Sequence, residues 1–415
     1  MKQSQLFTKT LKTEPKDEIS KNARLLIRGG FIHKEMAGVY SFLPLGLKVL
    51  EKIKNIIREE LNKIGALEIK MTALQKKEVW EPSGRWSDKI VDDWFKTKLK
   101  NQSELGLAFT HEEPITNIMK NFISSYKDLP IYAYQFQTKF RNELRAKSGL
   151  LRSREFLMKD LYDFSPNKKE HEKFYEKMKQ VYMKIFKRVG IGDQTFLTIS
   201  SGGSFSKYSY EFQTLTPAGE DIILLNREKK IAINKNDFTP EIKKDFNINK
   251  KTEFEEVKSA EVGDIYTLGE KFSKALNLRY KDPSGKEHYV YMGSYGIGVP
   301  RLMGVAVEVF SDNKGIIWPD SIAPFKVHLI SLNQNQTTEK IYKTLRRKKI
   351  SVLYDDRKEK RAGEKFADAD LIGCPIRIVI SEKTLINQSA EVKKRNSSQT
   401  QLIKIKELNN FLEKI

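Results

Sequence analysis

A stretch with two prolines, Trp318 to Phe325, separates two parts of the chain that differ in hydropathy pattern. Beyond it, short apolar runs typical of buried strands alternate with amphipathic segments typical of helices. Such an alternation indicates a small α/β unit in which helices cover a sheet. We therefore predict a separate α/β domain from residue 324 onward, with strands at 326–332, 350–356 and 376–380 and helices at 338–348, 365–372 and 407–415.

The part before this stretch contains longer strands that are rich in aromatic residues. Residues 131–143 and 154–164 are such segments, and the Ser/Gly-containing stretch between them predicts an antiparallel pair joined by a loop. Apolar residues at helical spacing predict a long amphipathic helix from Gly46 to Gly65, with the second glycine as its C-cap. Further elements are predicted as a charged helix at 171–189, a strand at 288–292 and an apolar helix at 301–310.

The composition indicates a globular protein with a polyanionic partner. The chain has 415 residues and a net charge of +21, which favours nucleic acid first and an anionic membrane second. A lysine-rich proteome would give the same composition. The single cysteine, Cys374, excludes an intramolecular disulfide, and no Cys/His group has zinc spacing. Neither a secretory signal nor an apolar run of about 18 residues occurs, so we expect a soluble cytoplasmic protein without a membrane span.

Arg141 and Glu143 stand two apart on a predicted strand, so their side chains share a face. A guanidinium fork suits a phosphate or a carboxylate, and the neighbouring carboxylate could accept from the amine of adenine. Phe156, on the presumed partner strand, could stack on a base. Taken alone, however, an arginine and a glutamate at this spacing more often form a salt bridge across the strand face.

Two further segments offer ligand-binding groups. The glycines of Gly293–Arg301 follow a strand and would let the backbone approach a ligand, and Arg301 opens a helix where it can bind a phosphate. A packed glycine turn is the structural alternative. Thr110 and Glu112 could hold an ammonium group, although an N-cap threonine followed by first-turn acids is a common helix start.

Glu211 and Gln213 lie on one face of another predicted strand. Oxygen ligands of this kind could hold Mg²⁺ and a nucleotide phosphate or ribose. A solvated strand face is an equally good explanation when the segment is taken alone.

Together, these segments and their order resemble the bacterial-type prolyl-tRNA synthetases, in the short form that lacks an editing insertion. The resemblance covers nearly the whole chain apart from residues 226–258. Each motif alone is modest evidence, but their joint order is specific and outweighs the structural alternatives above. The segments that resemble the family, in family order, are GVYSFLPLGLKVLEKI, SGRW, THEE, SYKDLP, YQFQTKFRNE, GLLRSREFLMKDLYDF, EFQTL, GED, MGSYGIGVPR, GIIWPDSIAPF and DDRKEKRAGEKFADADLIGCP.

The resemblance implies an aminoacyl-tRNA ligase of class II. Such an enzyme activates L-proline with ATP to prolyl-adenylate and transfers it to the 3′ end of tRNA(Pro). Arginines and Mg²⁺ supply positive charge in the transition state, and no covalent enzyme intermediate is needed. The implied roles are catalysis by Arg141 and Arg301; ATP binding by Arg141, Glu143, Phe156, Gln213, Thr214 and Arg301; proline binding by Thr110, Glu112, Arg141, Ser294 and Gly296; metal binding by Glu211; and tRNA binding by Arg145, Lys147, Asp356, Arg357 and Lys365.

The resemblance also implies a fold and a domain order. The fold class is an α+β catalytic domain of class II synthetase type, an antiparallel sheet with flanking helices, followed by an α/β anticodon-binding domain. A homodimer is implied as well. The expected boundaries are 1–225 and 259–323 for the catalytic domain, 226–258 for a short insertion in place of the editing domain, and 324–415 for the anticodon-binding domain.

The chain departs from the family pattern at several positions. Thr72 replaces the first-motif proline at the dimer interface, Ala146 interrupts the usual Arg-Pro-Arg of the second-motif loop, and Tyr210 replaces a histidine. Two alternatives stay open: a class II synthetase for another amino acid, and a catalytically inactive RNA-binding paralogue. The retained Arg141 and Arg301 favour an active enzyme, and THEE with GSYGIG favours proline.

The insertion at residues 226–258 is polar and rich in lysine. It is shorter than the roughly 50 residues of an independent domain. We therefore predict a solvated surface strap without a core of its own, and an enzyme that does not edit alanine.

Overall fold

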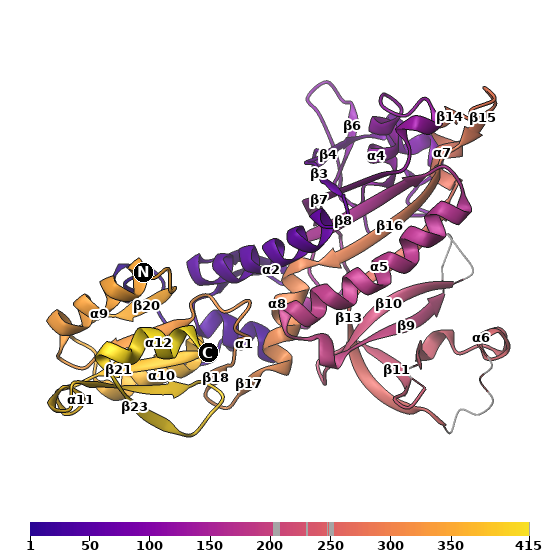
Figure 1. Cartoon of the computed structure of the whole chain (residues 1–415). Coiled ribbons are helices and arrows are strands. Elements are labelled where there is room, and N and C mark those ends of the chain that lie inside the picture. The colour runs from indigo at the N-terminus through magenta and orange to yellow at the C-terminus, as the bar shows by residue number, and fades with distance from the viewer. Residues whose placement is uncertain (202–207, 230, 247, 249–252, 415) are drawn as a thin grey trace. The chain divides into compact units, whose positions relative to one another are not determined.

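The computed structural model describes residues 1–201, 208–229, 231–246, 248 and 253–414, and it divides into two compact units (Figure 1). The larger unit comprises Glu35–Tyr40 and Ile53–Val305, and the smaller comprises Met1–Lys34, Ser41–Lys52 and Ala306–Ile415. Elements that run from one unit into the other are the hairpin of β1 (Ile32–Met36) and β2 (Val39–Phe42), and helices α2 (Pro44–Asn62) and α8 (Val299–Val309).

The larger unit is built on a nine-stranded sheet in the order β10-β9-β12-β11-β13-β16-β8-β7-β3. Neighbouring strands are antiparallel, except that β12 is parallel to β9 and β3 is parallel to β7. Helix α5 (Lys168–Val189) runs along the sheet (Figure 1). Its Tyr175 hydroxyl donates a hydrogen bond to the carbonyl of Ile265 in β13. The strands are β3 (Leu67–Glu68), β7 (Ile131–Phe140), β8 (Glu155–Ser165), β9 (Thr195–Ser201), β10 (Tyr208–Leu215), β11 (Asp221–Asn226), β12 (Ile231–Asn234), β13 (Glu255–Gly269) and β16 (Tyr291–Gly298).

The long elements predicted from the sequence are confirmed. β7 and β8 form the predicted antiparallel pair, and β8 continues into pairing with β16 on its other side. The predicted long helix at residues 46–65 is α2, and the charged helix at 171–189 is α5. Gly190 has a left-handed backbone and ends α5 by donating its N–H to the carbonyls of Phe186 and Lys187 in the last turn, which is the usual role of a C-cap glycine.

Five strands of the large sheet pair in a closed circle, because β13 is long enough to serve several partners. Its first half pairs with β11, and its second half pairs with β10 and β16. β10 pairs with β9, β9 with β12, and β12 with β11, which completes the circle. At the junction, Ser259 of β13 stands opposite both Leu215 of β10 and Asp221 of β11.

The insertion at residues 226–258 belongs to this circle, so the prediction of a solvated strap is wrong for its described residues. It contributes β12 and helix α6 (Pro240–Asp245). Ile233, Ile242 and Ile248 are buried against Ile199 of β9. Because Ile199 lies outside the insertion, the segment packs onto the sheet instead of forming an independent domain.

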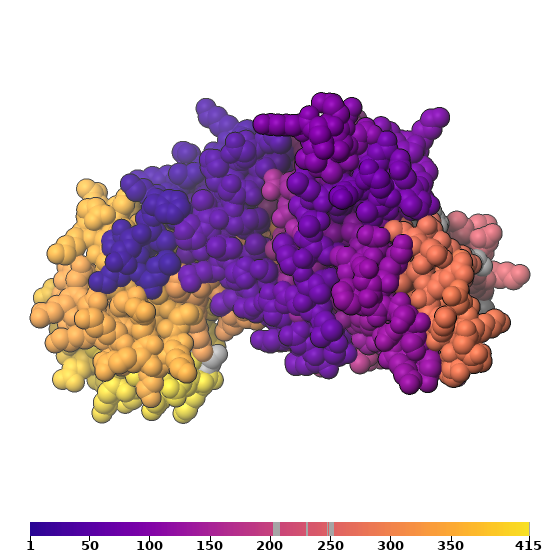
Figure 2. All heavy atoms as spheres, turned by 90° about the horizontal axis from the view of Figure 1, so that it is seen from above, coloured from indigo at the N-terminus to yellow at the C-terminus, as the bar shows by residue number. Residues whose placement is uncertain are grey.

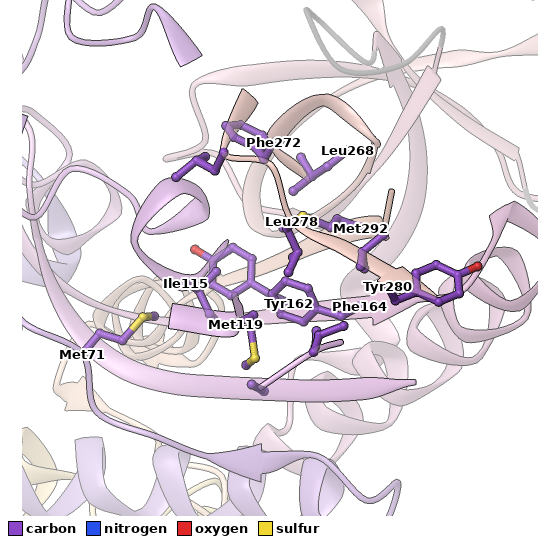
Figure 3. Packing of buried hydrophobic residues seen from close by; sticks show 14 residues of the cluster. Met71, Ile115, Met119, Tyr162, Phe164, Leu268, Phe272, Leu278, Tyr280 and Met292 are labelled. Carbon is purple, nitrogen blue, oxygen red and sulfur yellow. The ribbon is translucent and has the colours of Figure 1, made fainter. Parts of the chain in front are cut away.

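A second apolar cluster lies on the large sheet under helix α4 (Glu112–Met119). Ile115 and Met119 of this helix pack against Tyr162 of β8 and Met292 of β16 (Figure 3). Figure 2 shows the orange surface of the β14–β15 hairpin beside the purple segment that precedes β7, where Ser125 forms a bridge to Lys281. The smaller elements of this unit are β4 (Leu74–Lys76), β5 (Lys96–Lys98), β6 (Glu104–Leu107), β14 (Arg279–Lys281), β15 (Glu287–Tyr289), α3 (Lys77–Trp80) and α7 (Lys271–Ala275).

The smaller unit contains a five-stranded sheet in the order β20-β19-β21-β22-β23. The first three strands are parallel and confirm the predicted strand–helix alternation, whereas the last two are antiparallel and were not predicted. No helix among the described residues has the length and apolar character that crossing a membrane requires. The elements are α1 (Lys21–Arg28), β17 (Ser311–Asp312), β18 (Gly315–Ile316), β19 (Val327–Ser331), α9 (Asn335–Arg347), β20 (Val352–Asp355), α10 (Ala362–Ile372), β21 (Ile376–Ile380), α11 (Glu382–Ile386), β22 (Ser389–Lys394), β23 (Thr400–Lys404) and α12 (Leu408–Glu413).

Gly46 of α2 allows a close approach that we expect to be essential for stability. A Cβ atom at this position would lie 2.1 Å from the backbone oxygen of Phe31. Gly46→Ala should therefore lower the free energy of unfolding by about 1–3 kcal/mol, as overpacking typically does. Gly363→Ala is the matched control in α10, where a Cβ meets nothing within 4 Å and alanine should be neutral or stabilising. Equal urea midpoints for the two variants would contradict this assignment.

Candidate active site

Arg141 directly follows β7 and is held in place by its backbone. Its N–H donates to the carbonyl of Arg154 at 2.8 Å, which extends the β7–β8 ladder by one bond. The guanidinium lies over the rings of Phe109 and Phe156, with centroid distances of 5.1 and 5.4 Å. Its Nε is buried and has no hydrogen-bond partner among the described residues. A buried donor without a partner is costly, so this group is suited to an anionic ligand.

The predicted nucleotide-binding residues Arg141, Glu143 and Arg301 line one cleft of about 260 Å³. Arg301 of α8 donates through Nη1 to the backbone oxygen of Glu261 at 2.9 Å. Glu143 forms an ion pair with Arg152 at 2.7 Å, a partner that the sequence did not reveal. The lining residues are Arg141, Glu143, Leu151, Arg152, Glu220, Asp221, Ala260, Glu261 and Arg301.

Gln213 connects strands beside this cleft. Its Nε2 donates to Glu211 at 3.0 Å and to Asp221 at 2.9 Å, while its Oε1 is buried without a partner in the described part of the chain. Thr214 does not join these groups, because its hydroxyl is buried and hydrogen-bonded to Thr195 at 2.8 Å. The structure therefore brings Glu211 and Gln213 together, as predicted, and places Thr214 apart from them.

A group of carboxylates surrounds the cleft. Burial raises the pKa of Glu211 above its usual value and that of Glu261 to about 8, and neighbouring carboxylates add to both shifts. Burial also raises the pKa of Asp264, although Arg141 and Arg301 oppose that shift. The shifts show that negative charge in this part of the site is incompletely balanced by the protein.

This donor set fits a hard divalent cation that is held largely by its ligand. No group of three or more His, Cys, Asp or Glu side chains among the described residues is arranged as a ready metal site. Mg²⁺ is commonly bound by one or two carboxylates together with substrate phosphates and water, so a complete protein cage is not required. Glu211 supplies a carboxylate whose Oε2 already accepts from Gln213.

A second group of polar side chains, which we call the amino acid pocket, lies where α4 begins. The Glu112 carboxylate is 7% exposed; its Oε2 accepts from Thr110 at 2.7 Å and its Oε1 from Ser294 at 3.3 Å. Burial alone would raise the pKa of Glu112, but the Arg85 guanidinium and the Thr110 hydroxyl outweigh it and hold this pKa below its usual value. The predicted Thr110, Glu112 and Ser294 thus form one anionic site that suits an ammonium group.

Gly296 lies two residues beyond Ser294 on β16. Its N–H donates to Asp264 Oδ1 at 3.1 Å, and a Cβ at this position would lie 2.4 Å from the same oxygen. A glycine is therefore needed for this contact. Since Ser294 contacts the ammonium-type site and Gly296 contacts the acids beside the nucleotide cleft, β16 connects the two.

Sequence reasoning missed a buried network behind this pocket. His111 Nδ1 lies 2.6 Å from the Lys139 ammonium, which forms an ion pair with Asp160 at 2.9 Å. Burial, and then the charge of Lys139, lowers the pKa of His111 to about 4. Its other ring nitrogen, Nε2, lies 3.1 Å from the Thr72 carbonyl. A lysine inside an aromatic strand was the available signal, because burying a charge requires a partner.

Arg145 and Lys147 lie in the connection between β7 and β8. Arg145 is exposed, and the Lys147 side chain is 62% exposed with its ammonium 3.9 Å from Glu220. Both side chains are open to a large polyanionic ligand.

The other predicted tRNA contacts occupy a different environment. Arg357 forms ion pairs with Asp355 at 2.7 Å and with Asp368 at 2.9 Å. Lys365 is only 3% exposed and donates to the backbone oxygen of Ser331 at 2.7 Å. The structure thus shows the salt bridge of Arg357 and a buried Lys365, and the RNA-binding roles of these residues stay predictions.

Asp356, a further predicted tRNA contact, is hydrogen-bonded to a residue near the start of the chain. Its carboxylate accepts from the Ser4 hydroxyl at 2.7 Å and from the Ser4 backbone N–H at 3.0 Å. These bonds are exposed, so a polar ligand could compete for them.

Comparison with known proteins agrees with this geometry. Residues 95–310 match the model "tRNA synthetase class II core domain (G, H, P, S and T)", and residues 324–415 match "Anticodon binding domain". Proline–tRNA ligases of Rickettsia rickettsii (strain Sheila Smith) and Rickettsia prowazekii (strain Madrid E) are each 38% identical, over 426 and 429 residues. That of Agrobacterium fabrum is 36% identical over 439 residues, and each alignment covers 99% of both chains.

The chain belongs to the family of proline–tRNA ligases. Its fold is therefore the predicted one, a class II synthetase core followed by an anticodon-binding domain. The relatives share its length, which confirms the prediction of a short form. Class II synthetases use ATP and a divalent metal, in agreement with the arginines and acids of the cleft.

The pocket also contains Glu113, which has a titration that should be measurable. Glu113 is fully buried, and burial raises its pKa to about 7. A carboxyl whose folded-state pKa is raised stabilises the fold below its unfolded pKa of about 4.3, and loses this contribution as pH rises through the folded value. We expect the unfolding free energy of the wild type to fall between pH 5 and pH 8 relative to that of Glu113→Gln. Urea denaturation of both proteins at the two pH values measures this, and parallel curves would contradict it.

Proposed function

We propose that the chain activates L-proline with ATP to prolyl-adenylate and then transfers the prolyl group to the 3′ end of tRNA(Pro). The observation that carries this proposal is the arrangement along β16. Ser294 contacts the buried Glu112 carboxylate, and Gly296 contacts Asp264 beside the cleft that holds Arg141 and Arg301. A cationic amino group and an anionic triphosphate can therefore bind next to each other.

The amino acid is held by its charges. Its secondary ammonium binds Glu112 and Thr110, since Glu112 is buried and keeps a depressed pKa. Ser294 and Gly296 border the same place on β16. The carboxylate of proline points to Arg141, whose unpaired Nε is a donor without a partner in the described structure. This orientation places the nucleophilic carboxylate oxygen against the α-phosphate.

ATP occupies the cleft of Arg141, Glu143 and Arg301. Arg141 binds the α-phosphate and Arg301 the γ-phosphate, while Glu143 accepts from the adenine amine and Phe156 stacks on the ring. Gln213 completes the nucleotide contacts, and Thr214, whose hydroxyl is bonded to Thr195, supports β10 from the other face of the strand. When the carboxylate attacks the α-phosphorus, fixed positive charge stabilises the additional negative charge and pyrophosphate leaves.

The divalent metal is Mg²⁺, held by Glu211 and the phosphates. It supplies positive charge that offsets the repulsion between triphosphate and carboxylates. The raised pKa of Glu211 supports this role, because a site with incompletely balanced negative charge favours a cation.

The enzyme works in the cytoplasm. Its tRNA contacts both units of the chain. Arg145 and Lys147 are exposed and are available to the acceptor end. The anticodon-binding surface includes Asp356, Arg357 and Lys365. Asp356 contacts the RNA directly. Arg357 and Lys365 act indirectly, through a charge network that holds the connection between β20 and α10. The net charge of the chain, +21, supports a polyanionic partner. Because phosphate contacts release counterions, the affinity for tRNA should fall steeply as the salt concentration rises.

We further propose that two copies of the chain form a homodimer. The edge strand β3 presents Leu67 at 65% exposure, and Leu74 nearby is 55% exposed. Exposed leucines beside an open sheet edge favour burial against another chain. The domain boundaries proposed above, at residues 225, 258 and 323, follow the family organisation.

Two rival functions remain distinguishable. A ligase for another amino acid would keep Arg141 and Arg301 but would change the groups around Glu112. An inactive RNA-binding paralogue would be expected to lack Arg141, Glu143 or Arg301, and these three residues are present and line one cleft. ATP–pyrophosphate exchange tested with all twenty amino acids separates the three, since only proline should support rapid exchange.

Arg141→Ala should abolish proline-dependent exchange. Removing one preorganised transition-state donor typically costs about 10²–10³ in rate. Because the Nε of Arg141 has no partner among the described residues, and Asp264 keeps its bond from the Gly296 N–H, the variant should stay folded. Exchange near the wild-type rate in the folded variant would remove Arg141 from the site. Arg279→Ala, at an exposed ion pair, serves as the control.

The enzyme should activate alanine and should not remove it from tRNA. A pocket shaped for proline discriminates poorly against a smaller side chain, at about 1–3 kcal/mol for each missing methylene. The described residues of the insertion at 226–258 pack onto the sheet and form no separate hydrolytic domain. Purified enzyme should form alanyl-tRNA(Pro) slowly and leave it intact. Rapid deacylation of added alanyl-tRNA(Pro) by this chain alone would refute the prediction.

A further inference from the structure

Arg85 reaches the carboxylates of the amino acid pocket from a neighbouring loop. Its side chain is 12% exposed, and its Nη1 lies 3.2 Å from Glu112 Oε2. The same nitrogen lies 3.2 Å from both carboxylate oxygens of Glu113. The guanidinium also lies over the rings of Trp80 and Phe272, at 5.2 and 5.4 Å from the centroids, and Figure 3 shows Phe272 within the buried cluster.

We propose that Arg85 is a positioning residue of this pocket. It holds the Glu112 carboxylate in the orientation that receives the ammonium group of the amino acid, and Glu113 in turn holds Arg85. The inference rests on the proposed function, because it assigns the substrate's ammonium to Glu112. It adds a residue that touches no substrate and acts only through Glu112.

The contacts of Glu112 divide its two oxygens between protein and ligand. Oε2 accepts from Thr110 at 2.7 Å and from Arg85 at 3.2 Å, so the protein occupies it. Among the described residues, the bond given for Oε1 is a long one of 3.3 Å from the Ser294 hydroxyl. Oε1 is therefore the oxygen with capacity for a strong charge-assisted bond. Without Arg85, only a rotatable hydroxyl would fix Oε2, and the carboxylate could turn.

Glu113 keeps Arg85 in place and sets the charge of the pocket. Its Oε1 accepts from the Ser83 hydroxyl at 2.7 Å, and its side chain is fully buried. The charged groups that face it are Arg85 from the loop, Glu112 from its own helix and Lys271 from α7. Ionisation of Glu113 therefore adds one negative charge to a group in which Glu112 already faces the guanidinium of Arg85 and the ammonium of Lys271, and this change favours binding of a substrate ammonium.

The balance depends on pH in a direction that the geometry predicts. Burial raises the pKa of Glu113 to about 7, so this group gains its proton at mildly acidic pH. Protonated Glu113 leaves Arg85 to neutralise Glu112 alone, and the attraction for an ammonium group weakens. Ionised Glu113 restores the attraction. The KM for proline should therefore fall as pH rises from 6 to 8.5.

The first test is ATP–pyrophosphate exchange with purified full-length wild type, Arg85→Met and Arg85→Lys. Arg85→Met should raise the KM for proline roughly tenfold or more, the cost of losing a bond between charged groups, and leave the KM for ATP within about twofold. The KM for proline of Arg85→Lys should lie between those of the wild type and Arg85→Met, because an ammonium cannot reproduce the planar guanidinium that stacks on Trp80. Arg279→Met, which breaks an exposed pair with Glu287, should leave both constants unchanged.

A purely structural role would give a different result. In that case Arg85→Met would lower the unfolding temperature and raise the KM for proline and ATP together. A folded Arg85→Met enzyme with the wild-type KM for proline would overturn the proposal. Absence of proline-dependent exchange in the wild type would instead overturn the proposed function, so the two failures are distinct.

Glu113→Gln provides a second, independent measurement if Arg85→Met does not fold. Glutamine resembles the protonated acid, so the variant should match the wild-type KM for proline at pH 6. At pH 8.5 its KM should exceed that of the wild type by about threefold or more, because it lacks the extra negative charge. Titration of proline itself affects both proteins equally. The same pH dependence in both enzymes would exclude Glu113 from the arrangement.

Discussion

The register of β7, β8 and β16 is the constraint on which the active site depends. Asp160 of β8 stands opposite Gln135 on one neighbour and Gly296 on the other. Two residues later, Tyr162 stands opposite Ala133 and Ser294. Because side chains alternate between sheet faces, a slip of one residue would turn both toward helix α5 and dismantle the pocket. The long β7–β8 ladder and the buried cluster around Tyr162 make such a slip costly.

Buried ion pairs then fix the orientation of the side chains that the strand register brings together. Lys139 pairs with Asp160, and Arg85 pairs with Glu112 and Glu113, in largely buried surroundings. Removing water from these groups is expensive, and only good geometry with a partner offsets the cost. Each pair consequently tolerates few arrangements. The pocket is preorganised by electrostatics as much as by apolar packing, which suits a site that must place a small substrate accurately.

The sequence predicted what depends on local pattern and on motif order. Helices α2 and α5 and the β7–β8 pair follow from periodicity, and family membership follows from the ordered motifs. Contacts between distant segments could not be predicted in this way. The insertion looked like a polar strap because its buried isoleucines are few and widely spaced, and their partner Ile199 comes from an earlier strand. The same reasoning applies to Arg85, because the carboxylates that it contacts, Glu112 and Glu113, lie on helix α4.

The closed circle of strands connects this insertion to the cleft that Arg141 and Arg301 line. The acids beside the cleft come from three of its strands: Glu211 from β10, Asp221 from β11, and Glu261 from β13. β12, which lies in the insertion, joins β11 to β9 and so closes the circle. Without it, β11 would be paired on one side only, and the bond from Gln213 to Asp221 would span a frayed edge. The insertion therefore fixes the separation of Glu211, Asp221 and Glu261, and its Asn234 also donates a hydrogen bond to Glu211 at 3.5 Å.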